Sequence, residues 1–380
     1  MSTAVTEAPT TALTINTTRG ELLPALEAVM LSAPKRPPVP ILAGVLLDPV
    51  AGTLSTTDYE VTTSVAVAGL WGSGRAVLNA AALHTAVKTG GKTKTALASP
   101  VSLVIADGKA TVTVSGMTVQ LQTLPESEFP TLGHNLTAKV ETVFTVDADL
   151  LRQSWDRVSV ATATGRDCLP ILESLHLTTE SGWLTLASTD RYRLHESRVG
   201  VIIDASQPAL DICVPVQVSK SLKHLSGPVT VSVGGDAITC RSAGLTVTIR
   251  LQAGEFPKIT SIWHKDGADS FTCDRDNLLN AVKTLKSFRE LNIPIRFRPN
   301  GDTLTSRIGT DNVVEGPHIT CEGEMPEGFA LNPNFLADLL NTLPVGQIRV
   351  THAGPGRPLG FASDTAPGFR GLLMPVKFAE

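Results

Sequence analysis

One pattern occurs three times along the chain, and this internal repeat restricts the possible folds more than any other feature. The copies are PILAGVLLDPVAGTLSTTDYEV from Pro40, PILESLHLTTESGWLTLASTDRYRL from Pro170 and PIRFRPNGDTLTSRIGTDNV from Pro294. Each copy begins with Pro-Ile, reads as two strands separated by a glycine turn, and ends in Thr-Asp. Ordered landmarks at a matching spacing predict three similar structural units rather than one domain with chance similarities.

Two predicted helices accompany each copy. The first precedes Pro-Ile: GELLPALEAVML from Gly20, DADLLRQSWDRVSVA from Asp147 and DRDNLLNAVKTLKSF from Asp274. The second lies in the middle of the repeat: LNAAALHTAV from Leu78, VPVQVSKSLKHL from Val214 and NPNFLADLLNTL from Asn332. Apolar residues recur at helical spacing, and Asp147 and Asp274 are suited to cap helix N-termini.

The remaining residues of each repeat alternate as antiparallel strands, as in ATVTVSGMTVQLQTL and ITCRSAGLTVTIRLQ. An apolar strand is expected to close each repeat at Phe129-Pro130, Phe256-Pro257 and Met374-Pro375. The predicted fold class is α+β, with two helices packed on antiparallel sheets in every repeat. The predicted domains are a flexible lead at residues 1–11 and repeats at residues 12–137, 138–262 and 263–380.

Three repeats placed edge to edge leave two free sheet edges. Exposed edges must be paired or they promote aggregation. A head-to-tail contact with a second copy uses both edges and can close into a ring. The sequence therefore predicts a homodimer.

No arrangement of residues typical of catalysis is present. The eight histidines are dispersed, the GGKT segment at residues 90–93 lacks the first glycine of a phosphate loop, and there is no GxSxG motif. The repeated Asp58, Asp190 and Asp311 could be acids, but an Asx-type turn that closes each strand is the favoured interpretation. We therefore predict no catalytic residues, no metal and no cofactor. An enzyme with an unrecognised site and a β-rich adhesion array remain alternatives.

The charge balance allows a local basic surface but excludes a polycation, because the formal net charge is −4 with 32 basic and 36 acidic residues. Aromatic residues make up only 4%, which argues against a base-stacking platform. Basic residues recur on or just after the predicted helices of all three repeats. Although an ordinary solvated surface explains any one helix, the recurrence favours a shared face that contacts phosphates without reading sequence.

In total, the chain resembles a bacterial DNA polymerase III beta subunit, the replicative sliding clamp, from about residue 12 to its end. The resemblance is carried by Lys35-Arg36-Pro37, Ser188–Leu194, Glu255–Lys258 and Leu372–Lys377, in this order on the three-fold repeat. It implies a ring of two copies with helices lining the hole, which encircles duplex DNA and tethers the replicative polymerase and repair factors. It also implies a non-catalytic protein, with the polymerase III catalytic subunit, the clamp loader, other polymerases and mismatch-repair proteins as partners.

The resemblance places Arg36 and Arg166 close to DNA. Together with basic residues on or just after the predicted helices, the expected DNA-binding set is Arg36, Lys88, Lys92, Arg152, Arg166, Lys220 and Lys223.

In the family, partner peptides dock in a hydrophobic pocket between the second and third domains. The matching positions here are Leu172, Thr189, Arg191, Tyr192, Arg193, Leu194, Pro257, Ile262, Asn332, Phe335, Leu372, Met374, Pro375, Val376 and Lys377. We expect Arg193 and Lys377 to hold peptide carbonyls or an acidic residue at the rim.

Some pocket positions depart from the family pattern. Arg191 and Tyr192 are bulkier than the Gly-His of many clamps, although such a pair is familiar in actinobacterial clamps. Ser261 replaces a common basic residue, and Lys377 a frequent arginine. These departures leave open a paralogue whose altered pocket escapes a clamp-binding antibiotic.

A cytoplasmic, nucleoid-associated location is expected. The five cysteines are scattered without a CxxC pair, which fits reduced thiols. No run of about 18 apolar residues is present, and the N-terminus lacks the features of a secretory signal.

Overall fold

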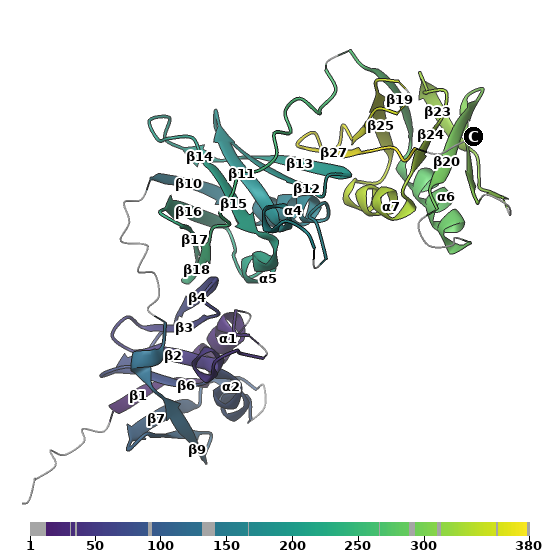
Figure 1. Cartoon of the computed structure of the whole chain (residues 1–380). Helices are drawn as coiled ribbons and strands as arrows, with labels where there is room; N and C mark the ends of the chain where they lie inside the picture. Colours follow the sequence, from purple (N-terminus) through teal and green to yellow (C-terminus); the bar gives the residue numbers. More distant parts are fainter. Residues whose placement is uncertain are drawn as a thin grey trace, which may run out of the picture. The chain divides into compact units, whose positions relative to one another are not determined.

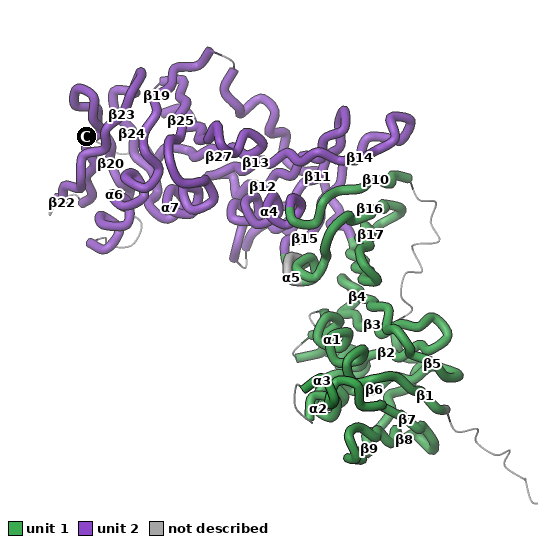
Figure 2. The backbone as a smooth tube through the Cα atoms, turned by 180° about the vertical axis from the view of Figure 1, so that it is seen from behind, with its two compact units in different colours: residues 1–149, 217–250 green, residues 150–216, 251–380 purple. Residues whose placement is uncertain are grey.

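The structure is a computed structural model of the chain (Figure 1). It describes residues 13–30, 32–34, 36–89, 93–130, 141–165, 167–265, 267–288, 293–309, 313–354 and 356–377. The chain forms two compact units (Figure 2). Unit 1 contains residues 1–149 and 217–250, and unit 2 contains residues 150–216 and 251–380.

The sheet of unit 1 joins strands of the first and second repeats in the order β10-β16-β17-β18-β4-β3-β2-β6-β9-β8-β7-β1-β5, with antiparallel pairs throughout. The bounds are β1 Leu13–Thr18, β2 Gly44–Asp48, β3 Thr53–Thr57, β4 Val61–Ala66, β5 Trp71–Gly72, β6 Ala76–Asn79, β7 Pro100–Ala106, β8 Lys109–Val114, β9 Met117–Leu124, β10 Thr142–Asp147, β16 Pro228–Gly234, β17 Ala237–Ser242 and β18 Leu245–Arg250. The helices are α1 Arg19–Val29, α2 Ala80–Lys88, α3 Lys94–Leu97 and α5 Ser219–Leu222.

The core of unit 1 lies between the sheet and the adjacent helices α1 and α2. Leu22, Leu26 and Leu83 are fully buried in it, together with Val45 and Leu54 from the sheet. Because each helix places its apolar side chains on one face, burying that face stabilises the helices against the strands.

Unit 2 holds a second antiparallel sheet, in the order β15-β11-β12-β13-β27-β26-β25-β19-β23-β21-β20-β24, with β22 beside β21. The bounds are β11 Ser174–Glu180, β12 Trp183–Thr189, β13 Arg193–Gly200, β15 Asp211–Pro215, β19 Asp269–Asp274, β20 Ile295–Asn300, β21 Thr303–Ile308, β22 Val314–Glu315, β23 Ile319–Gly323, β24 Phe329–Leu331, β25 Gln347–His352, β26 Leu359–Ala362 and β27 Phe369–Leu373. The unit also contains the two-residue strand β14, Ile202–Ile203, which does not belong to this sheet. The helices are α4 Ala148–Ser159, α6 Arg275–Ser287 and α7 Pro333–Thr342.

Helices α6 and α7 pack side by side against the sheet in the third repeat. Val282, Leu285 and Leu339 are fully buried there. A Cβ atom at Gly371 would overlap the side chain of Leu339, so glycine allows β27 to approach α7 closely. This contact fixes α7 beside the C-terminal strand.

The predicted α+β class is confirmed, and five of the six predicted helices match closely. Asp274 accepts a hydrogen bond from the Asn277 N–H, and Asn332 caps α7 with Pro333 in the first turn. The helix predicted from Val214 is wrong in length. Its first residues end β15, and a 3₁₀ turn, Val216–Val218, leads into the four-residue α5. Proline and β-branched valines favour the extended start.

Two strand predictions also need correction. Pro40–Ala43 and Pro170–Glu173 are 3₁₀ turns, and β2 and β11 begin after them. Proline suits the first position of such a turn because its φ is already near the required value. Phe129-Pro130 and Phe256-Pro257 follow β9 and β18 in irregular segments, whereas Met374-Pro375 directly follows β27.

Candidate functional site

A tight turn before β13 positions the first group of predicted pocket residues. The carboxylate Oδ1 of Asp190 accepts hydrogen bonds from the N–H groups of Tyr192 and Arg193, each with an N···O distance of 2.9 Å. The Thr189 hydroxyl donates to the Arg193 carbonyl over 2.7 Å. Arg191 has a φ of 78°, in the left-handed region that few non-glycine residues adopt. The predicted Asx turn is thus present at Asp190 and leaves Tyr192 61% exposed.

The same turn recurs in the first repeat. Asp58 Oδ1 accepts from the N–H groups of Glu60 and Val61, over 3.0 and 2.7 Å, and Tyr59 has a φ of 76°. Asp311 lies outside the described residues. Asp58 and Asp190 are therefore interpreted as structural residues and not as catalytic acids, because their carboxylate oxygens accept hydrogen bonds from backbone N–H groups.

Arg193 links this turn to helix α7. Its Nε donates to Asp190 Oδ2 over 2.8 Å, and its Nη1 donates to Asp338 Oδ2 over 3.0 Å. Its guanidinium carbon lies 4.5 Å from the centre of the Phe335 ring. The side chain is only 9% exposed. Tyr192, Arg193, Phe335 and Asp338 are called the Arg193 cluster below.

Phe335 reaches the cluster because α7 begins at a fixed point. Asn332 Oδ1 accepts hydrogen bonds from the N–H groups of Asn334 and Phe335, over 2.9 and 3.4 Å. The Phe335 ring then stacks on Tyr192, with centroids 6.4 Å apart and planes 26° apart. Asp338 follows three residues later on the same helix face. Sequence reasoning missed Asp338, although its spacing from Phe335 was visible.

The C-terminal strand completes this part of the site. In the antiparallel pair of β13 and β27, Leu194 lies opposite Leu372. Beyond β27, the Met374 N–H donates to the Tyr192 carbonyl over 2.8 Å, and the Val376 N–H donates to the Ala330 carbonyl over 2.8 Å. Pro375 lies between them and has no N–H to donate. Met374 and Val376 are 40% and 39% exposed, and Lys377 is exposed.

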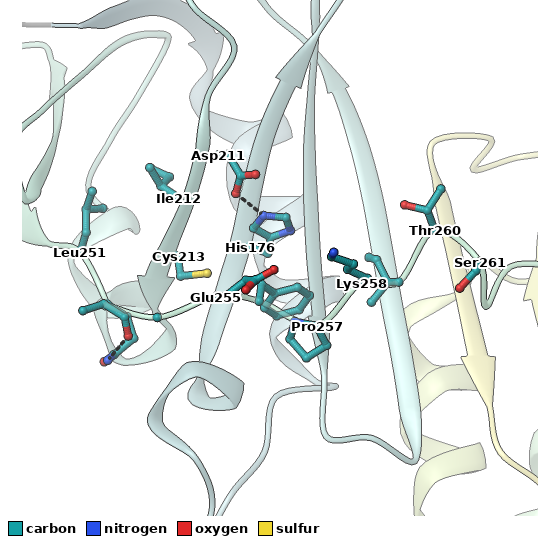
Figure 3. A pocket seen from close by; sticks show the side chains of 15 residues that line it. His176, Asp211, Ile212, Cys213, Leu251, Glu255, Pro257, Lys258, Thr260 and Ser261 are labelled. Atoms are coloured by element: carbon teal, nitrogen blue, oxygen red, sulfur yellow. Dashed lines mark hydrogen bonds and ion pairs between the residues drawn. The ribbon is translucent and has the colours of Figure 1, made fainter.

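The remaining predicted pocket residues lie on other segments of unit 2. Leu172 is buried in the 3₁₀ turn before β11. Ile262 is 41% exposed, and its N–H donates to the Ile259 carbonyl. Pro257 lines a pocket of about 810 Å³, together with Ser261 (Figure 3).

That pocket contains a histidine, a carboxylate and a cysteine on neighbouring strands. His176 Nε2 lies 2.7 Å from Asp211 Oδ1 (Figure 3). The imidazole stacks on Phe256, with centroids 4.7 Å apart. Burial raises the pKa of the Cys213 thiol to about 11, which keeps it protonated and a poor nucleophile at neutral pH. Within the described ranges, no group of three or more His, Cys, Asp or Glu side chains could hold a metal ion.

The predicted DNA-binding residues lie on separate elements of the two units. Arg36 is exposed in the loop after α1, Lys88 is exposed at the end of α2, and Lys223 is exposed just after α5. Arg152 is half-buried on α4 in unit 2. Lys92, Arg166 and the side chain of Lys220 lie outside the described residues. None of the helices in the described part of the chain is long and apolar enough to cross a membrane.

Comparisons with known proteins identify the family. A family profile for the N-terminal domain of the DNA polymerase III beta subunit matches residues 12–133, and the profile for its central domain matches residues 145–258. The Streptomyces coelicolor beta sliding clamp is 28% identical, with 96% of this chain and 99% of the relative covered. The beta sliding clamp homolog GriR of Streptomyces muensis is 26% identical, with 90% and 93% covered.

Solved clamps share the fold. The crystal structure of a Pseudomonas aeruginosa sliding clamp superposes with a TM-score of 0.87 at 21% identity, covering 96% of this chain and all of that one. The same bacterium's clamp bound to griselimycin gives a TM-score of 0.85, with 97% of this chain covered. The chain therefore belongs to the family of DNA polymerase III beta subunits, the beta sliding clamps, and is a non-catalytic processivity factor.

Proposed function

We propose that two copies of this chain close head to tail into a ring around duplex DNA, and that the ring tethers a DNA polymerase and other clamp-binding proteins through the Arg193 cluster and its surroundings. The proposal assigns the repeats to residues 12–137, 138–262 and 263–380. The observation that carries it is a junction that occurs twice within the chain.

At each junction, the strand that follows a Thr-Asp turn pairs with the last strand of the next repeat. In unit 1, β4 follows Asp58 and pairs antiparallel with β18. In unit 2, β13 follows Asp190 and pairs antiparallel with β27. The same backbone geometry thus joins successive repeats, and it is independent of how the two units are placed.

A third junction of this kind requires a second copy. The strand after Asp311 is β22, which among the described residues pairs with β21 alone. The last strand of the first repeat is β9, which pairs along residues 117–122 with β8 and reaches β6 only at Thr123 and Leu124. Pairing β22 of one copy with β9 of another would satisfy both edges and close a two-fold ring. Val313 and Phe288, 47% and 62% exposed, would lie near this contact.

Retention on DNA would come from topology instead of tight binding. The net charge of −4 disfavours a strong, immobile complex with phosphates. Exposed cations such as Arg36, Lys88 and Lys223 would give weak contacts that are independent of sequence and compatible with sliding.

The peptide site is proposed at the β13–β27 junction because apolar groups are exposed there. Tyr192, Met374 and Val376 each expose more than a third of their surface. Such an exposed apolar patch suits a peptide with Leu or Phe anchors. Burying two large side chains would contribute about 3–6 kcal/mol before ordering costs, which corresponds to roughly micromolar affinity.

A decisive experiment loads the protein onto nicked circular DNA with a clamp loader. The expected result is retention on the circle through gel filtration and release when the DNA is cut once. Equal retention on circular and linear DNA would contradict a topological ring, and a stable monomer in sedimentation equilibrium at micromolar concentration would contradict closure.

A second candidate function is a clamp copy whose pocket has a lowered affinity for a clamp-binding antibiotic. It is favoured by the bulky, exposed Tyr192, which stacks on Phe335 at the proposed pocket. Titration with griselimycin distinguishes the two: tight binding to this chain would rule out the resistance role.

A further inference from the structure

Arg193 pairs with two carboxylates, Asp190 in the turn before β13 and Asp338 on helix α7. Asp190 binds Nε and Asp338 binds Nη1, at 2.8 and 3.0 Å. Two carboxylates and one guanidinium carry a formal net charge of −1. Arg193 is therefore not the open anion-binding residue expected at the rim, because its charge is already neutralised.

The two carboxylates differ in how firmly they are held. The Asp190 side chain is 12% exposed and also accepts two backbone N–H groups of its own turn. The Asp338 side chain is 47% exposed and approaches from helix α7. Asp190 is part of the turn, whereas Asp338 is the partner that solvent or a ligand can reach.

We propose that Asp338 is a specificity-determining residue, which competes with carboxylates of the bound peptide for Arg193 and so selects neutral or basic peptide residues at that position. A guanidinium has five N–H donors, so a neutral peptide carbonyl can still be bound while Asp338 stays in place. A peptide carboxylate would have to displace Asp338 or lie beside a like charge. This inference rests on the peptide site proposed above.

The test is a charge scan measured by fluorescence anisotropy. The labelled peptides have the form Gln-Ala-Ala-Leu-Phe. Each carries a single Glu or Gln, placed at one of the two alanine positions or directly after the Phe. With the wild-type protein, Glu at the position facing Arg193 is expected to bind about fivefold more weakly than Gln, the scale of a partly exposed charge pair. In Asp338→Asn, the ratio of the Gln-peptide affinity to the Glu-peptide affinity at that position should fall from about fivefold to about one.

Asp364→Asn is the matched control, because Asp364 is also an exposed aspartate paired with an arginine, Arg349, at 3.1 Å. It should leave the Glu-to-Gln ratio unchanged at every position. Exposed Arg191 and Lys377 would favour Glu at other positions, and Asp338→Asn should not alter that preference.

The possible failures are distinguishable. If the peptides bind but the Glu-to-Gln ratio is the same in wild type and Asp338→Asn, the role of Asp338 is overturned and the proposed peptide site stands. If no peptide binds the wild-type dimer, the proposed site fails and this inference fails with it.

Discussion

The backbone N–H of Met374 donates a 2.8 Å hydrogen bond to the carbonyl of Tyr192, and this contact ties the C-terminal segment to the turn before β13. It brings the backbones of two residues with exposed side chains together, although their positions in the chain differ by 182 (374 − 192). The proposed peptide site therefore includes residues that follow the last strand.

Deleting residues 374–380 should abolish binding of a Gln-x-x-Leu-Phe peptide, because the deletion removes one wall of the exposed apolar patch. The dimer should persist, because β9 and β22 are unchanged. Isothermal titration and sedimentation equilibrium measure the two properties. Met374→Ala is the milder variant, with an expected loss of about tenfold.

Val345→Ala is the control for that series, since Val345 is an apolar residue of the same unit that is 68% exposed. It should bind the peptide as the wild type does. Unchanged peptide affinity in the truncated protein would place the site elsewhere.

Arg19→Met should destabilise unit 1 by about 1–3 kcal/mol. Arg19 is 1% exposed, and its Nε and Nη2 donate to the Val87 and Lys88 carbonyls over 2.6 and 2.8 Å, at the C-terminal end of α2. The methionine would leave these carbonyls without the donors that satisfy a helix end. Urea unfolding followed by circular dichroism measures the loss.

Arg75→Met is the comparison, because Arg75 forms an exposed ion pair with Glu126 and should change stability by less than about 1 kcal/mol. A similar decrease in the free energy of unfolding in the two variants would show that the buried hydrogen bonds of Arg19 stabilise the unit no more than an exposed ion pair does.

Unit 2 should lose stability in mild acid through His195. Complete burial is the main cause that lowers the pKa of its imidazole from 6.5 to about 4, while Nδ1–H donates to the Arg157 carbonyl over 2.8 Å. The folded pKa lies below the unfolded one, so protons bind the unfolded chain first as pH falls. The neutral His195 imidazole therefore contributes to the free energy of unfolding above pH 6.5. This contribution, about 3 kcal/mol in total, is lost as the pH falls towards 4.

Urea midpoints measured between pH 7 and pH 4 check this expectation. The slope of stability against pH should become shallower in His195→Gln and stay the same in His224→Gln, because His224 is exposed. An equal slope in wild type and His195→Gln would assign the acid sensitivity to other groups.

Arg36→Ala combined with Lys88→Ala should weaken direct binding to a short duplex without altering the dimer. Both residues are exposed, and each phosphate contact that is lost should reduce the slope of log K against log salt by about 1. Anisotropy titrations at several salt concentrations measure this slope.

Arg241→Ala, an exposed arginine on strand β17, is the control and should leave the salt slope unchanged. If the control reduces the slope as much as the double variant, the helix-associated cations are not the DNA-contacting set.

Several features could be predicted from the sequence because they depend on residues close together in the chain. The Asx turns at Asp58 and Asp190 and the cap of α6 by Asp274 use partners three residues away. Alternating strands and glycine turns are equally local. A local pattern was insufficient at α5, where valines and a proline shortened the helix.

Only the tertiary structure decided which side chains meet at the site. The partners Arg193 and Asp338 are 145 residues apart, and the strands β13 and β27 come from different repeats. Propensity and periodicity describe single elements, and they carry no information on which strand edges pair or which helix faces a given turn. The sequence alone determined a repeated pattern of helices and antiparallel strands. From the sequence, Arg193 was expected to be available to a ligand, but tertiary packing pairs it with the carboxylates of Asp190 and Asp338.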